Sequence, residues 1–342
     1  MNDSLSPTAL ESIWSKTAAT LGIDFVAKST AIVAPCTHLR VILCSGKDAP
    51  DFLQRQFTAD LAQLEPGEGA ITGYCTPKGR LLGIFLVFRR VTDFLLLTDA
   101  TIADAINARL QLYLLRAEVS LTPLPDWGVL LLGKEAATHE ATAEHASATG
   151  LIAAWPGVPR YQLRIAPLIE LVSLWQMLER SSLTKCGPCQ FDLLAIRHGL
   201  PIVIDATSEL FIPQAVNLDL IGGVSFNKGC YPGQEIVARV RYLGRLKTRM
   251  IRATVTTADM VSVAAPVSFL ANDEQKPGVV VSAVCCNDGT AWELLAVVPV
   301  ATLGTDTARL FNPSGPVLRE QSLPYSLATA SAAAPLSSAG PV

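Results

Sequence analysis

The chain has 342 residues, of which 50% are apolar and 17% charged, with a formal net charge of −3 and a pI near 5.9. This length allows two or three domains with substantial cores, and the apolar fraction excludes a disordered protein. The slightly acidic balance argues against non-specific nucleic-acid binding by the protein as a whole, so no strong nucleic-acid binding is expected.

No segment is expected to direct the chain to a membrane or out of the cell. Residues 1–4 contain neither a basic region nor an apolar run, so no secretory signal is predicted. The apolar stretch 81–98 is broken by Arg89, Arg90 and Asp93 and is too interrupted to span a bilayer. The eight cysteines have no framework spacing and predict reduced thiols in a leaderless chain. We therefore expect a cytoplasmic protein.

The body of the chain alternates predicted strands and helices. Asp48 and Pro50 are residues favoured at a helix start, and Thr76–Arg80 is typical of a hairpin tip. In chain order we predict a helical lead-in over residues 1–30, strand 39–43, helix 48–61, strands 71–74, 81–88 and 94–97, helix 102–115, strands 119–124 and 129–132, a surface helix or loop over 135–150, strand 161–165, and helices 169–179 and 189–198.

Beyond Arg252 the pattern changes to short β-rich runs separated by Asp, Asn, Gly and Pro, which predicts a small β-barrel or sandwich. Its strands are predicted at residues 253–256, 266–270, 279–283 and 291–298. We predict four parts: a lead-in (1–30), an α+β body (31–244), a β domain (245–326) and a disordered tail rich in Ala, Ser and Pro (327–342).

The segment Lys228–Glu235 concentrates a cation, a thiol, two glycines, a proline and an acid in eight residues. A glycine hinge and a short strand are predicted before it (220–226), and a helix after it (236–243). Cys230 should then lie on a tight turn at a helix start, where the helix dipole and the Lys228 ammonium favour the thiolate. The alternative is a buried structural cysteine with Lys228 solvated outside it.

The sequence Cys186-Gly187-Pro188-Cys189 matches the thioredoxin redox motif. That chemistry needs a strand directly before the first cysteine and a helix starting at it. Here the preceding predicted element is a helix joined by a polar loop, so we favour a loop turn with two free thiols. No second Cys or His pair completes a zinc site, and no preformed metal site is predicted.

A basic stretch follows the Lys228–Glu235 segment, with no acid between Glu235 and Asp259. It could hold a phosphate, a carboxylate-rich tail or RNA, or be a solvated face. Its members are Arg239, Arg241, Arg245, Lys247, Arg249 and Arg252. Three aspartates, Asp60, Asp192 and Asp219, lie between apolar residues and could be helix caps or ligand contacts, with no spacing that forms a catalytic pair.

A family resemblance emerges from residues 211–235, which read FIPQAVNLD and then LIGGVSFNKGCYPGQE. With Gly199–Pro201 upstream, this run resembles the YgfZ family of folate-binding proteins. That family includes a mitochondrial iron–sulfur assembly factor and is related to the aminomethyltransferase of the glycine cleavage system. Residues 52–60 and 76–80 are similar to the family's N-terminal motifs, and the resemblance covers most of the chain.

The resemblance implies three domains in a ring around a folate-sized channel: two intertwined aminomethyltransferase-like α+β domains and a C-terminal β-barrel. It implies tetrahydrofolate as cofactor, and iron–sulfur enzymes or assembly proteins as partners. The functional thiol would be Cys230. The residues expected to contact folate are Lys228, Cys230, Tyr231, Gln234 and Asn217.

Two departures from the related aminomethyltransferases affect the expected chemistry. Residues 81–85 contain no acid where those enzymes carry an aspartate beside the folate, and Arg197 falls at the position of a pterin-contacting glutamate. General acid–base work on folate nitrogens therefore lacks its obvious agent. The leading hypothesis is a tetrahydrofolate-binding accessory protein for iron–sulfur enzymes, including those that modify tRNA. The alternatives are a folate-dependent one-carbon transferase or demethylase, and a thiol oxidoreductase using Cys186 and Cys189.

Overall fold

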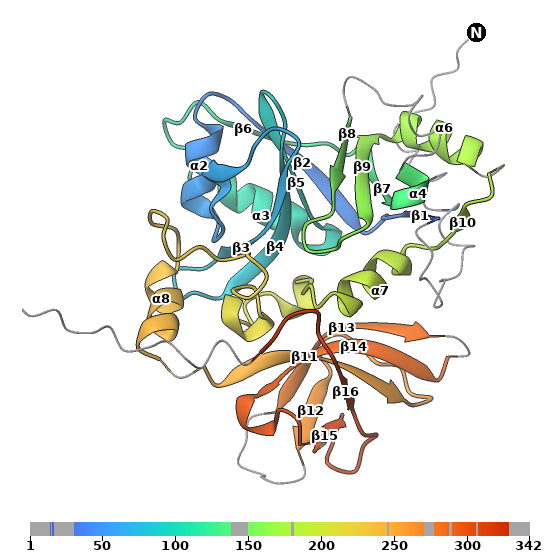
Figure 1. The fold of residues 1–342 in the computed structure, drawn as a ribbon. Helices are drawn as coiled ribbons and strands as arrows, with labels where there is room; N and C mark the ends of the chain where they lie inside the picture. The colour runs from blue at the N-terminus through green and yellow to red at the C-terminus, as the bar shows by residue number, and fades with distance from the viewer. Residues whose placement is uncertain are drawn as a thin grey trace, which may run out of the picture.

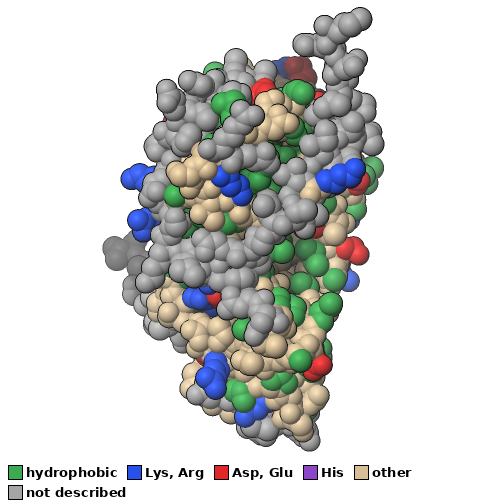
Figure 2. All heavy atoms as spheres, turned by 90° about the vertical axis from the view of Figure 1, so that its right-hand side faces the viewer, with side chains coloured by type: hydrophobic (Ala, Val, Ile, Leu, Met, Phe, Trp, Pro, Cys, Tyr) green, Lys and Arg blue, Asp and Glu red, His purple; other side chains and the backbone are tan. Residues whose placement is uncertain are grey.

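The computed structural model describes residues 14, 16, 31–137, 150–178, 181–244, 246–269, 277–286, 289–305 and 307–327. In these parts of the chain it is a mixed α/β protein with three sheets, two side by side and the third packed across them (Figure 1). On the face in Figure 2, the described basic side chains are dispersed among apolar ones and form no single patch.

The first sheet is antiparallel and has helices on one face. Strand β4 is buried on both faces, because its alternate side chains enter two different cores. Ile84 and Leu86 enter the central core, and Phe85 and Val87 enter the core beneath the helices. In sheet order its strands are β3 (Gly69–Cys75), β4 (Leu81–Arg89), β5 (Asp93–Asp99), β2 (Leu39–Ser45) and β6 (Ser120–Pro123); its helices are α2 (Ala49–Gln56) and α3 (Ala100–Gln111), with the turn η1 (Leu61–Gln63).

The second sheet combines segments from distant parts of the chain. Strand β1 pairs antiparallel with β7 and parallel with β10, the register joining Ile32 to Thr184. Helix α6 covers one face, where Trp175 also meets Trp14 edge to face. The sheet order is β10 (Thr184–Lys185), β1 (Ile32–Pro35), β7 (Trp127–Gly133), β9 (Tyr161–Pro167) and β8 (Leu151–Ala154); the helices are α4 (Lys134–Ala137) and α6 (Leu168–Leu178).

Between these sheets and the third run α7 (Cys189–Arg197), η2 (Asp205–Thr207), η3 (Pro213–Val216) and α8 (Gln234–Tyr242). The third sheet is antiparallel and forms a half-barrel. An isolated bridge between Arg309 and Val317 brings its two edges towards each other. Its order is β15 (Ala308–Leu310), β12 (Pro266–Phe269), β13 (Gly278–Cys286), β14 (Ala291–Pro299), β11 (Thr248–Thr256) and β16 (Arg319–Gln321), with η4 at Val300–Thr302.

Most predicted elements of the body are found, with boundaries shifted by a few residues. The helix predicted over 48–61 was wrong beyond Gln56, because Phe57 instead pairs with Tyr74 of β3. The strand predicted within 220–226 was also wrong. That segment is a turn and an extended run, attached where the Ser225 amide donates to the carbonyl of Thr58 at 2.8 Å.

The predicted C-terminal β region corresponds to the half-barrel, while the ring of three domains and the boundaries at 30, 244 and 326 remain predictions. The predicted lead-in helix, apart from Trp14 and Lys16, and the predicted tail lie outside the described residues, as does most of 135–150.

Candidate functional site

The loop that carries Cys230 is fixed against the tip of the β3–β4 hairpin. Gly233 adopts φ +81°, and a Cβ there would lie 2.5 Å from the Thr76 carbonyl oxygen and 2.7 Å from the Cα of Gly79. Only glycine satisfies both the left-handed backbone and this close approach. Gly233 is also the N-cap of α8, so the loop and the helix are positioned together.

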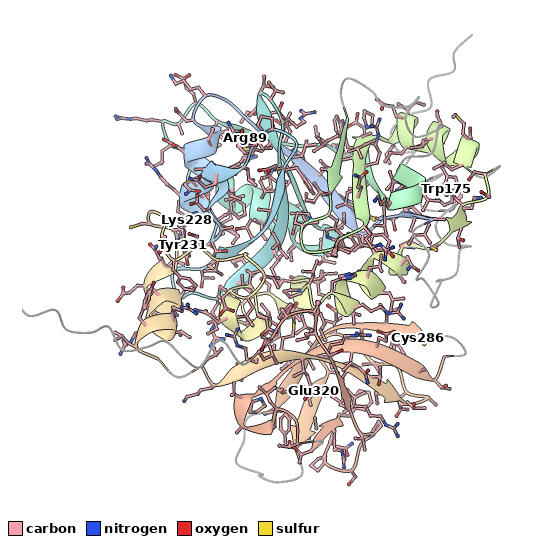
Figure 3. All side chains as sticks on the ribbon, viewed as in Figure 1. Arg89, Trp175, Lys228, Tyr231, Cys286 and Glu320 are labelled. Atoms are coloured by element: carbon pink, nitrogen blue, oxygen red, sulfur yellow. The ribbon has the colours of Figure 1, made fainter. Side chains whose placement is uncertain are left out.

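Lys228 ties this loop to the segment leaving α2. Its ammonium donates to the carbonyl oxygens of Phe57 at 2.8 Å and Ala59 at 2.6 Å. It also lies 5.6 Å from the centre of the Tyr231 ring, and the two side chains are neighbours in Figure 3. Burial lowers the pKa of Lys228 to about 8, against the opposing effect of Asp60. The expected roles as folate contact or activator of Cys230 stay predictions; the hydrogen bonds that Lys228 makes are to the backbone.

Cys230 is a free, exposed thiol. The helix start predicted beside it was displaced: α8 begins at Gln234, so Cys230 and Pro232 lie in the preceding loop, while Glu235 is in the first turn as expected. The alternative of a buried cysteine with a solvated Lys228 was wrong on both counts. The loop therefore presents the Cys230 sulfur to molecules outside the protein.

The other expected folate contacts differ in accessibility. Tyr231 is buried, its hydroxyl has no hydrogen-bond partner among the residues that the structure describes, and burial raises its pKa. The Gln234 amide donates to the Lys228 carbonyl at 3.5 Å. Asn217 is fully buried, and its amide bonds both the carbonyl and the N–H of Met250 in β11, at 2.7 and 3.3 Å. Its NH2 also donates to the Tyr325 hydroxyl at 3.3 Å. These positions remain predicted contacts, and Asn217 in this geometry connects the body to the half-barrel.

The upstream aspartates serve as partners of basic or amide groups. Asp219 pairs with Arg249 at 2.7 and 3.0 Å, both side chains being only 3% exposed. Asp60 accepts from Gln54 at 2.8 Å. Asp192 lies 3.5 Å from His38, and burial raises the pKa of its carboxyl.

The Cys186–Cys189 motif has more of the thioredoxin context than its sequence predicted. Strand β10 directly precedes Cys186, contrary to expectation, because Thr184 pairs with Ile32 of β1. However, α7 begins at Cys189 rather than Cys186. Cys186 is buried, and the pKa of Cys189 is raised by burial and then by Asp192, which disfavours its thiolate.

A small apolar cavity of about 40 Å³ lies between the first sheet, α7 and the loop at residues 200–202. Trp155 and Phe191 wall it and stack with their ring centres 4.1 Å apart. Asp99, which was not predicted as a site residue, supplies a carboxylate to the lining. An acid directly before α3 could have been predicted as a site residue from the sequence, but an acid at that position is also typical of a helix cap. Asp99 does cap the helix, because its carboxylate accepts a hydrogen bond from the Thr101 amide at 2.8 Å.

The two positions that depart from the aminomethyltransferases lie on either side of this region. Ile84 of β4 faces the cavity with an apolar side chain, while the side chain of Phe85 enters the core beneath the helices. Arg197, at the end of α7, points instead to the half-barrel, where Glu293 holds both it and Arg252 at 2.6 and 2.9 Å. Within the described residues, no group of three His, Cys, Asp or Glu side chains could hold a metal ion, and no helix is long and apolar enough to cross a membrane.

No family model matches the chain. Among curated proteins, it is 28% identical over 308 residues to a tRNA-modifying protein YgfZ of Yersinia pseudotuberculosis, covering 84% of this chain and 90% of the relative. A protein of the same description from Klebsiella pneumoniae is 28% identical over 296 residues, covering 83% and 89%. Among solved structures, the glycine cleavage system aminomethyltransferase T of Bartonella henselae matches with a TM-score of 0.63 and 19% identity over 85% of each chain.

Proposed function

We propose that the chain, which is similar to YgfZ proteins over most of its length and has an aminomethyltransferase-like fold, is a tetrahydrofolate-binding accessory protein. In this proposal it supports the assembly or repair of iron–sulfur enzymes, including those that modify tRNA, and acts in the cytoplasm. Its partners are folate and the iron–sulfur enzymes or their assembly proteins.

The observation that carries the proposal is the exposed thiol of Cys230 on a rigidly anchored loop. A thiol that serves a partner protein must be reachable by that partner, whereas a buried thiol is inert. The hydrogen bonds of Lys228 and the close approach at Gly233 fix the backbone on both sides of Cys230. The loop can therefore offer the sulfur without having to order itself when a partner binds.

The cavity beneath the first sheet has a chemistry that fits a pteridine ring. Stacked aromatic walls from Trp155 and Phe191 suit a flat heterocycle, and the Asp99 carboxylate suits its amino group. A cavity of about 40 Å³ must widen to admit it, since small-molecule sites usually span roughly 300–1,000 Å³. When bound, the folate would supply one-carbon chemistry. The protein's own contribution is to orient the ring and keep water away from it.

Replacement of the thiol tests the proposal. In cells whose own copy is deleted, a Cys230→Ala protein should fail to restore the activity of iron–sulfur tRNA-modifying enzymes. Cys189→Ala is the matched control, because Cys189 is also an exposed thiol, and it should restore that activity fully. Full activity with Cys230→Ala would refute the proposed role of the thiol.

Folate binding is tested separately by calorimetric titration of tetrahydrofolate into the purified protein. Asp99→Asn should weaken binding about tenfold, because a hydrogen bond to a charged group contributes roughly 1.5–3 kcal/mol. Lys228→Ala tests the predicted folate contact in the Cys230 loop. No heat of binding with the unaltered protein would refute the folate part of the proposal.

Asp99 also favours one alternative, a folate-dependent one-carbon transferase or demethylase. Asp99 is a carboxylate in the cavity lining, where the related enzymes' acid is missing from β4. Incubation of the purified protein with tetrahydrofolate and methylamine donors distinguishes the two functions. Turnover without any iron–sulfur partner, abolished by Asp99→Asn, would establish the transferase instead.

A further inference from the structure

Helix α8 consists mostly of exposed and half-buried residues. Of its residues only Val237 is buried, while Tyr242 is 57% exposed. The helix stands at the edge of the molecule, away from the half-barrel strands (Figure 1). Because an amphipathic helix normally buries an apolar stripe, a helix with one buried residue has a surface left for another molecule.

Within the described residues, the arginines of this helix have no ion-pair partner, whereas Arg249 and Arg252 further along the chain do. Arg249 and Arg252 are held by Asp219 and Glu293, so the structure uses them internally. Arg239 and Arg241 are exposed, and neither has an ion-pair partner among the described residues. Within the basic stretch, Arg249 and Arg252 are thus used inside the fold, whereas Arg239 and Arg241 are available to bind another molecule.

Two aromatic rings lie beside these cations. Phe226 and Tyr242 meet edge to face with ring centres 6.2 Å apart, and the Arg241 guanidinium lies 5.3 Å from the centre of the Phe226 ring. Arg239 is three residues before Tyr242 and therefore shares its helix face. We call Phe226, Arg239, Arg241 and Tyr242 the α8 shelf.

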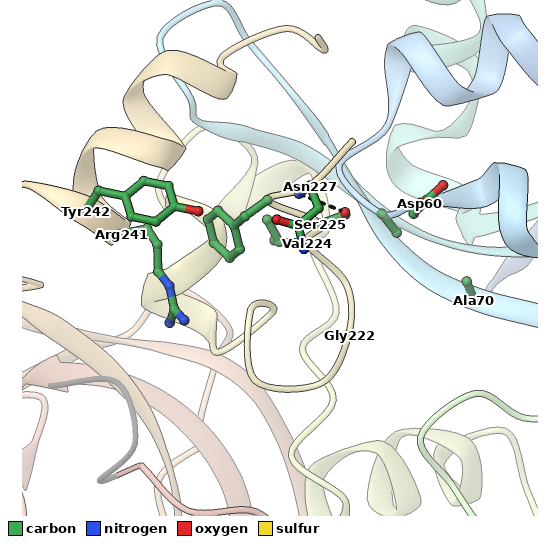
Figure 4. Close-up of a pocket in the computed structure, with 10 residues that line it drawn as sticks. Asp60, Ala70, Gly222, Val224, Ser225, Asn227, Arg241 and Tyr242 are labelled. Carbon is green, nitrogen blue, oxygen red and sulfur yellow. Dashed lines mark hydrogen bonds between the residues drawn. The ribbon is translucent and has the colours of Figure 1, made fainter. Parts of the chain in front are cut away.

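Three members of the α8 shelf, Phe226, Arg241 and Tyr242, border an open cavity of about 420 Å³, within the usual size range of small-molecule pockets (Figure 4), and Arg239 lies outside its lining. Its far side is formed by the loop of Ser225 and Asn227 and by Asp60. The side chains of Asn227 and Tyr242 make no hydrogen bond to other described residues, although the Asn227 N–H donates to the Ser225 hydroxyl. The polar and aromatic residues that line it are Asp60, Ser225, Phe226, Asn227, Arg241 and Tyr242.

We propose that the α8 shelf and its cavity bind single-stranded RNA, with Arg239 and Arg241 on phosphates and an unpaired base stacked on Tyr242 or Phe226 at the cavity. Aromatic faces beside arginines are how proteins hold single strands, because every base offers a face for stacking. A double helix hides its base faces and is not expected to bind. The choice of RNA over DNA rests on the proposed function, in which the client enzymes modify tRNA. The inference of a single-strand site does not depend on the proposed function.

The binding should be modest and local, since the protein as a whole is net acidic. Two phosphate contacts give a salt slope of about −1.4 in a plot of log affinity against log salt concentration. The affinity should then fall about sevenfold between 50 and 200 mM salt. Each aromatic ring that stacks a base should contribute at least about fivefold.

The test is fluorescence anisotropy of the full chain with a labelled 12-nucleotide RNA of mixed sequence, its duplex, and the DNA strand of the same sequence. The single-stranded RNA should bind. Tyr242→Leu, at an exposed position, should weaken it about fivefold or more. An Arg239→Gln/Arg241→Gln protein should lose the salt slope. Arg319→Gln, which removes an exposed cation from β16, should bind as the unaltered protein does.

Equal binding of duplex and single strand, or equal effects of the shelf variants and Arg319→Gln, would overturn the site. Equal binding of DNA would overturn its assignment to RNA. Competition by polyglutamate at the same affinity would assign the surface to an acidic protein instead, a partner that the exposed Ile236 and Leu243 would also suit. Cys230→Ala should bind RNA normally, so failure of the thiol proposal and failure of this one are distinguishable.

Discussion

Residues 211–235 contain two halves of opposite character. In the first half, Asn217 and Asp219 are buried, and their polar groups are satisfied by Met250, Tyr325 and Arg249. In the second half, the chain comes to the surface at Cys230, whose thiol is free. The first half of this continuous motif therefore connects the body to the half-barrel, and the second half exposes the Cys230 thiol. Similar sequence motifs should not be assigned to ligand contacts before the burial of each residue is known.

The largest expected effect is on the buried ion pair of the first half. Asp219→Ala should lower the free energy of unfolding by about 3–5 kcal/mol, because it leaves the Arg249 guanidinium buried and unpaired. Urea unfolding followed by circular dichroism measures the change. The exposed pair of Lys47 and Glu118 is the control, and Glu118→Ala should cost less than about 1 kcal/mol. Equal losses would erase the distinction between the buried and exposed pairs.

Asn217 is the next strongest test of the first half. It has φ +60°, and Asn217→Ala removes its hydrogen bonds to Met250 and places alanine in a left-handed backbone. The expected loss of unfolding free energy is about 2–3 kcal/mol. Asn217→Gly should recover about 1 kcal/mol of it, since glycine carries no backbone strain there. If Asn217→Ala instead leaves stability unchanged and weakens tetrahydrofolate binding, Asn217 belongs with the ligand contacts.

Lys228 should make folding stability depend on pH in the alkaline range. Its pKa is 10.5 ordinarily and about 8 in the folded protein, so between these values the unfolded chain binds more protons. The unfolding free energy of the unaltered protein should therefore rise from pH 8 towards pH 10.5 relative to Lys228→Met. Urea titrations of both proteins at several pH values measure the difference. Parallel curves would mean that the ammonium is not desolvated.

Cys230 should give the smallest effect on stability. Cys230→Ala removes an exposed side chain without a hydrogen bond to the described residues, so the unfolding free energy should change by no more than about 0.5 kcal/mol. Thermal unfolding compared with Cys186→Ala, a buried position, measures the contrast. A large loss on Cys230→Ala would move Cys230 to the structural half of the motif.

Several features could be predicted because they depend on neighbours in sequence. Alternation of apolar residues located the strands of the body, and the glycines flanking Cys230 predicted the turn. The half-barrel followed from short β-rich runs between turn residues. The helix from residue 48 was predicted too long because its last residues are apolar enough for a helix, and only pairing with Tyr74 takes Phe57 into an extended backbone.

The amino-acid sequence by itself determined the periodic elements, the family resemblance and the position of the thiol in a glycine-rich loop, since all three are local patterns. Tertiary structure alone decided which polar residues are used internally. Lys228 bonds carbonyls some 170 residues away, Asn217 bonds β11, and strand β10 exists only because β1 offers it a partner. Each of these contacts depends on atoms that only folding brings together. A polar residue is available to bind a ligand or partner only where folding has not already given it such a contact.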